Sequence, residues 1–80
     1  MKLLFKPSFE RIYKKLPASE KATIKRRVKE LFDYYDKDVL FAGLRVRKIS
    51  GKENYFEIDT ESNRRILVRK YKSLIEFIAY

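Results

Sequence analysis

The sequence predicts an α+β fold with the element order β-α-α-β-β-β-β, in which an N-terminal helix hairpin packs on one face of a twisted antiparallel sheet. Two patterns predict this class. Apolar residues recur at helical spacing between residues 8 and 35, whereas between residues 44 and 79 they alternate with polar residues. Six Phe and six Tyr residues supply large side chains, which a single domain of 80 residues needs to close a core.

The first half of the chain should form one strand and two helices. Residues 2–6 alternate between lysine and apolar side chains and end before a proline, as expected of an edge strand. A short helix should run from Ser8, a suitable N-cap, to Leu16, because its apolar residues are spaced i, i+3, i+4 and i+7. Pro17 ends that helix, and a second amphipathic helix should extend to about residue 35. Two helices separated by one proline predict an antiparallel hairpin.

After a linker, the second half should form four strands, at about residues 44–49, 54–59, 64–70 and 74–79. Clusters of Ser, Gly, Asn and Lys separate them as turns. Strands that follow one another across short turns pair as an antiparallel meander. We therefore expect one domain that includes all of residues 1–80.

Alternation also sorts the strand residues between the two faces of the sheet. If Ile66 and Val68 face the helices, the opposite, open face should carry the following side chains: Glu57, Asp59, Arg65 and Arg69. The residues of the strand at 44–49 divide less clearly between the two faces, because either assignment exposes a cation on the open face. The sequence therefore predicts a cationic open face built by neighbouring strands.

The charge balance suits a polyanionic partner, and the alternative is a solvated charge excess with no ligand. Twenty Lys and Arg residues against 11 Asp and Glu give a net charge of +9, which speeds encounter with nucleic acid, ribosomes or an acidic protein. The chain has no cysteine, as is typical of a reducing compartment, and no apolar run approaches the roughly 20 residues of a membrane span. We expect a cytoplasmic protein that acts without a membrane.

The open face suggests RNA cleavage at a 2′-hydroxyl, which needs a base, a group that stabilises the phosphorane and an acid for the leaving oxygen. Arginine suits the stabilising role, because its planar guanidinium binds phosphate through two donors. Since the chain has no histidine, the base would be Glu57 or Asp59 and the acid Lys48 or Tyr80. The alternative is that both acidic residues only pair with arginines in a solvated cross-strand ladder.

No metal or cofactor site is predicted. Without His or Cys, only scattered carboxylates remain as ligands, and Gly43 and Gly51 stand alone rather than in a phosphate-binding loop. We expect no metal ion and no small-molecule cofactor.

Over nearly its whole length, the chain resembles the RelE/ParE superfamily of toxins from toxin–antitoxin pairs. A first strand leads into a short helix that ends at Leu16-Pro17, and a second helix follows. The segments that carry the rest of the resemblance are Gly43-Leu44, Arg47-Lys48-Ile49-Ser50-Gly51, Tyr55-Phe56-Glu57-Ile58, Arg65-Ile66-Leu67 and Phe77-Ile78-Ala79. The family fold is the one that the periodicity predicts.

The resemblance implies one of two activities. RelE-like members are metal-independent endoribonucleases that cleave mRNA in the ribosomal A site and so inhibit translation, whereas ParE-like members inhibit DNA gyrase. An antitoxin neutralises both. We favour the RelE-like branch, with the ribosome, mRNA and a cognate antitoxin as partners. The alternatives are a gyrase inhibitor and a catalytically degenerate relative that only binds an antitoxin or nucleic acid.

The resemblance also assigns roles to residues. Arg65 matches the central-strand arginine that contacts the scissile phosphate, and Glu57 matches an acidic position common in one subgroup. The candidate catalytic residues are Arg65, Lys48, Glu57 and Tyr80. The candidate RNA-binding residues are Arg45, Arg47, Arg69 and Lys70.

Two departures from the family pattern bear on catalysis. Asp59 stands where the subgroup usually has arginine, and the sequence ends at Tyr80, where the family continues into a segment that bears His, Arg or Tyr. Either Tyr80 takes that role, or the segment is missing and cleavage is impaired.

Overall fold

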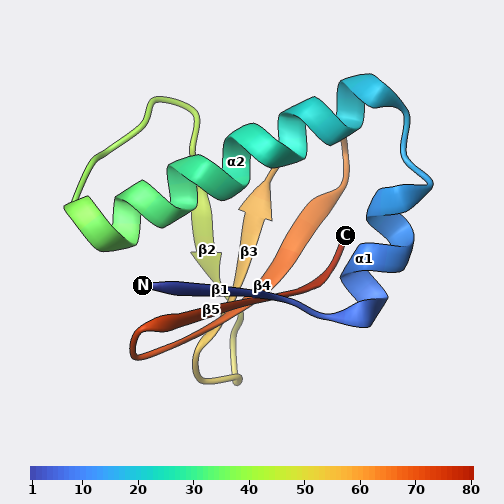
Figure 1. Cartoon of the computed structure of the whole chain (residues 1–80). Coiled ribbons are helices and arrows are strands. Elements are labelled where there is room, and N and C mark those ends of the chain that lie inside the picture. Colours follow the sequence, from blue (N-terminus) through green and yellow to red (C-terminus); the bar gives the residue numbers. More distant parts are fainter.

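The computed structural model describes all residues from Met1 to Tyr80 and has the predicted order of helices and strands (Figure 1). The elements are β1 (Lys2–Phe5), α1 (Pro7–Lys14), α2 (Ala18–Lys37), β2 (Val46–Lys48), β3 (Tyr55–Asp59), β4 (Arg65–Tyr71) and β5 (Leu74–Ala79). The fold is therefore α+β, as expected.

The start of α1 differs from the prediction. Pro7 occupies the first turn of the helix and Lys6 the capping position, without a side-chain hydrogen bond to the helix. Proline is favoured there because its missing N–H has no partner within the helix and its φ is already helical. Ser8 lies one residue inside, and its Oγ donates a 2.6 Å hydrogen bond to the Ile78 carbonyl. Ser8 thus ties α1 to β5 rather than capping α1.

The sheet has the strand order β1-β5-β4-β3-β2. Strands β2 to β5 form the expected antiparallel meander, but β1 pairs parallel with β5, so the prediction of a wholly antiparallel sheet is wrong at this edge. The parallel register sets Phe5 opposite Phe77, and their rings stack with centroids 4.8 Å apart. Alternation of polar and apolar residues has the same period in both directions, so it does not reveal the direction of β1.

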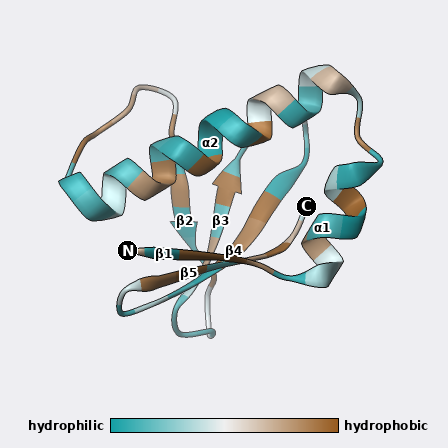
Figure 2. Ribbon diagram, viewed as in Figure 1, coloured by the Kyte–Doolittle hydropathy of each residue, from teal (hydrophilic) through white to brown (hydrophobic).

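The helices and the sheet enclose one core. Its fully buried apolar residues are Phe9, Ile24, Leu31, Ile58, Ile66, Val68, Ile75 and Phe77. Figure 2 shows apolar segments of the strands beneath α2, with the hydrophilic positions of α2 on its outer side. Figure 1 shows α1 lying crosswise to α2, rather than alongside it as in the predicted hairpin. Phe9 anchors α1 there, because its ring lies 5.7 Å from that of Phe77 on β5.

A buried arginine supports the segment that enters β2. Arg27 on α2 is 8% exposed, and its guanidinium pairs with Glu30 at 2.7 Å. Gly43 lies over this guanidinium with a φ of +86°, a conformation that residues with a Cβ rarely adopt. The chain therefore turns at Gly43, beside Arg27, just before Arg45 and β2.

Candidate nucleic-acid interface

The open face of the sheet is cationic, as the alternation predicted. Ile66 and Val68 are buried on the helix side, whereas Arg65 is exposed on the other side. In the register of β3 and β4, Asp59 lies opposite Arg65 and Tyr55 opposite Arg69. The side chains of Arg47, Arg65 and Arg69 therefore project from the same face, and neither helix covers them.

The centre of this face is a network of ion pairs. Asp59 Oδ1 accepts a 2.9 Å hydrogen bond from Arg47 on β2 and lies 3.1 Å from Arg65 Nε on β4. A second carboxylate, Glu57, contacts the Arg65 guanidinium at 3.1 Å. Because three strands contribute to this network, it fixes the position of the arginines relative to one another.

The network also fixes the ionisation of Asp59. The hydrogen bond from Arg47 is the main cause that lowers the pKa of Asp59, and the positive charges of Arg47, Arg65 and Arg45 lower it further, against the opposing effect of desolvation. The same hydrogen bond raises the pKa of Arg47. A general base near neutral pH needs a raised carboxyl pKa, so Asp59 is shifted in the wrong direction for that role.

Nearer the β1 edge, another carboxylate, that of Glu76, also lies between two cations. Glu76 on β5 lies 3.2 Å from Lys6 Nζ and 3.6 Å from an Arg69 guanidinium nitrogen. The two side chains cover Glu76, which is only 7% exposed. The open face thus alternates cations and anions across the strands, with arginines at its exposed positions.

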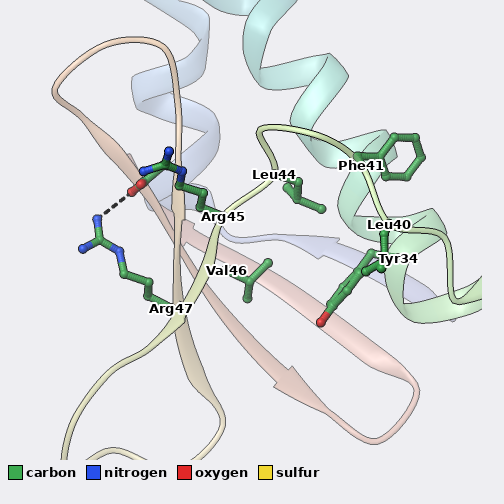
Figure 3. A pocket seen from close by; sticks show the side chains of 8 residues that line it. Tyr34, Leu40, Phe41, Leu44, Arg45, Val46 and Arg47 are labelled. Carbon is green, nitrogen blue, oxygen red and sulfur yellow. Dashed lines mark hydrogen bonds and ion pairs between the residues drawn. The ribbon is translucent and has the colours of Figure 1, made fainter.

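Arg45 precedes β2 and makes no ion pair, so its guanidinium is available to a ligand. Figure 3 shows Arg45 and Arg47 on one side of this segment and Val46 on the other, toward Tyr34 of α2. A hollow of about 510 Å³ lies here, partly apolar and open to solvent. Its lining residues are Tyr34, Leu40, Phe41, Leu44, Arg45, Val46, Arg47 and Asp59.

Two candidate site residues lie on the helix side of the sheet. Lys48 pairs with Phe56 and therefore projects away from the arginines. Lys70 alternates with Arg69, and its ammonium lies 5.0 Å from the ring centroid of Tyr35 on α2. The structure does not bring Lys48 or Lys70 together with Arg65.

Tyr80 is also separate from the Arg65 network. Its hydroxyl lies 3.1 Å from Ser62 Oγ, and the Arg64 guanidinium stacks 4.1 Å from its ring centroid. Arg64 further donates a 2.8 Å hydrogen bond to the Tyr80 carbonyl. Of the four candidate catalytic residues, the structure thus brings together only Arg65 and Glu57.

Two functional candidates were missed at the sequence level. Tyr55 and Tyr71 lie on the open face on either side of Arg69, at 6.0 and 5.7 Å from ring centroid to guanidinium carbon. The alternation that placed Arg69 on this face also places both tyrosines there. Only the strand register, however, shows that all three are neighbours.

Metal ligation, membrane spanning and similarity to known proteins bear on the site as well. No three acidic side chains gather in a way that could hold a metal ion. No helix is both long and apolar enough to cross a membrane. Comparison with protein-family models, with curated proteins and with solved structures gave no match.

Proposed function

We propose that this protein is the toxin of a toxin–antitoxin pair, of the RelE-like kind, and that it cleaves mRNA on the ribosome in the cytoplasm. The observation that supports this proposal is the gathering of Arg45, Arg47, Arg65 and Arg69 on one uncovered face of a chain with a net charge of +9. Guanidinium groups bind phosphates through paired donors, so this face suits an RNA backbone.

Within this proposal, Arg65 stabilises the negative charge that develops on the scissile phosphate. Its exposed guanidinium is oriented by Glu57 and Asp59, at 3.1 Å from each. Glu57 is the candidate base, because the lowered pKa of Asp59 keeps that residue ionised and weakly basic. Glu57 takes the proton of the attacking 2′-hydroxyl, and the leaving 5′-oxygen takes its proton from solvent water, since Lys48 and Tyr80 lie elsewhere. The arginines supply the positive charge, so the proposal requires neither a metal ion nor a cofactor.

One observation favours a second candidate function, a catalytically degenerate relative that only binds its antitoxin or nucleic acid. Two carboxylates already engage the Arg65 guanidinium, and neither predicted acid lies beside it. Under that alternative, the protein still binds RNA through its arginines but leaves the strand intact.

For the antitoxin, the hollow beside β2 is the most suitable surface. Leu40, which is 83% exposed, lines this hollow together with Arg45 and Arg47. An acidic segment with apolar side chains would bury Leu40 and pair with these arginines. Neutralisation would then also cover part of the cationic face.

The proposal is tested by expressing the protein without its antitoxin and measuring growth and mRNA cleavage on purified ribosomes. We expect Arg65→Ala to abolish both effects. The matched control is Arg26→Ala, which removes an exposed arginine that pairs with Glu61 away from the open face and should leave toxicity unchanged.

Unchanged growth inhibition by Arg65→Ala would contradict the proposal. RNA binding without cleavage by the parent protein would favour the degenerate relative. Cleaved plasmid trapped in a gyrase supercoiling assay would instead identify a ParE-like inhibitor.

A further inference from the structure

Two of the six tyrosines are set apart from the core. Four of them pack against it, namely Tyr13, Tyr34, Tyr35 and Tyr80. The remaining two, Tyr55 and Tyr71, project from the open face at the end of the sheet where β4 turns into β5. Tyr71 is 47% exposed. Tyr55 is half-buried, but neither ring packs against the core, so core packing does not account for an aromatic ring at either position.

Cations surround these two rings. The Arg69 guanidinium lies between them, at 6.0 Å from the Tyr55 centroid and 5.7 Å from the Tyr71 centroid. Lys52 lies 5.9 Å from the Tyr55 ring, and Lys72 lies 5.7 Å from the Tyr71 ring. Nearby positive charge restrains the rings and would attract a phosphate backbone to the same spot.

Unpaired nucleic-acid strands are bound by this combination of groups. Cationic side chains follow the phosphates, while exposed aromatic rings stack on bases, and every base has a face for stacking. A duplex hides its base faces within the helix, so such a surface discriminates against it. Both forms carry phosphates, so the arginine network around Asp59 offers no means of telling them apart, whereas the tyrosines would add a contact that only an unpaired strand can make.

We propose that Tyr55 and Tyr71 form a stacking platform for unpaired bases of an RNA strand whose phosphates lie along Arg65 and Arg69. This inference rests on the proposed function, since it extends the same open face toward the β4–β5 turn. Under this proposal the ligand is a single strand, and Tyr55 and Tyr71 contact its bases without any preference for a base sequence.

The simplest competing explanation is that tyrosine was selected at these positions for its preference for β-strands. Valine has a comparable preference and no ring, so Tyr55→Val and Tyr71→Val separate the two explanations. The matched controls are Tyr55→Phe and Tyr71→Phe, which keep the stacking surface and lose only the hydroxyl. The substitutions are combined into a double valine variant and a double phenylalanine variant, and circular dichroism should show that both fold as the parent does.

The test is fluorescence anisotropy with three labelled probes: an eight-nucleotide single-stranded RNA, the same strand with abasic sites, and the corresponding duplex. We expect the double valine variant to bind the intact strand about tenfold or more weakly than the parent, as expected for the loss of base stacking. The same variant should bind the abasic strand as the parent does, and the double phenylalanine variant should bind the intact strand normally.

Three results would overturn the platform. They are equal affinity of the parent for intact and abasic strands, unchanged binding by the double valine variant, and no measurable binding of the single strand. Arg65→Ala in the same assay keeps the two proposals distinct. If Arg65→Ala weakens binding of every probe while the valine variant does not, the phosphate-binding face stands and the platform fails. If only the valine variant weakens binding, the platform stands and the role of Arg65 fails.

Discussion

Asp59→Asn should strengthen RNA binding, although it removes ion pairs from the folded protein. At pH 7 the Asp59 carboxylate is ionised, and it lies between Arg47 and Arg65, at 2.9 and 3.1 Å. There it repels phosphate and occupies donors that phosphate would otherwise use. An amide has nearly the same shape but no charge, so the substitution releases Arg47 and Arg65 from the Asp59 carboxylate, while Glu57 still pairs with Arg65.

The size of the effect follows from the number of arginines that are freed. Each additional phosphate contact with a single strand steepens the dependence of log affinity on log salt by about 0.7. Between 50 and 200 mM salt, the variant's affinity should therefore fall about 2.6-fold more than the parent's for one contact, or roughly sevenfold more for two. At low salt, the variant should be the tighter binder.

A salt titration of fluorescence anisotropy with a single-stranded RNA measures this slope. The matched control is Asp33→Asn, which removes the same charge from α2, where Asp33 pairs with Lys37 at 3.8 Å. Equal slopes for the two variants would show that only net charge matters. Weaker binding by Asp59→Asn would show that the arginines need the carboxylate to hold them in place. Either result refutes the reasoning.

Three further predictions concern stability and the partner. Because its folded-state pKa is lowered, Asp59 stabilises the fold above its unfolded pKa of 3.8, and this contribution is lost as the pH falls through the lower folded value. Urea unfolding should thus find Asp59→Asn less stable than the parent at pH 7, with a difference that shrinks below about pH 4; a constant difference would contradict this. The ring of Phe77 is fully buried and stacks on Phe5, so Phe77→Ala should lower the free energy of unfolding by about 3–5 kcal/mol by the same method. A decrease below about 1 kcal/mol would contradict the place of Phe77 in the packed core. Leu40→Asp should leave growth inhibition intact and weaken neutralisation by the antitoxin in a co-expression assay; full neutralisation would place the antitoxin elsewhere.

The sequence was sufficient to predict the elements and the faces of the sheet, because both depend on local periodicity. Ile66 and Val68 are buried and Arg65 is exposed, as the two-residue alternation required. The direction of β1 was not predictable in this way. It depends on the pairing of Phe5 with Phe77, residues 72 positions apart in sequence, and on the Lys6 N–H that donates to the Phe77 carbonyl at 2.9 Å.

The candidate site was predictable only where its residues lie on adjacent strands. Arg47, Asp59, Glu57 and Arg65 meet because β2, β3 and β4 follow one another across short turns. Tyr80 does not join them, since the end of β5 lies beside Ser62 and Arg64. The position of a residue in the sequence pattern indicates the strand to which it belongs. Its neighbours in space also depend on the strand order and on the bulge in the β4–β5 pairing.

Both proposals require RNA to bind the open face of the sheet, and the chain offers a clear competing surface. The outer side of α2 also carries exposed cations, among them Lys25, Arg26 and Lys29. An NMR titration of the isotope-labelled protein with a single-stranded RNA distinguishes the two surfaces. We expect the guanidinium Nε–H signals of Arg47, Arg65 and Arg69 to shift while the backbone signals of α2 stay in place. Shifts confined to α2, with these arginine signals unmoved, would contradict RNA binding at the open face.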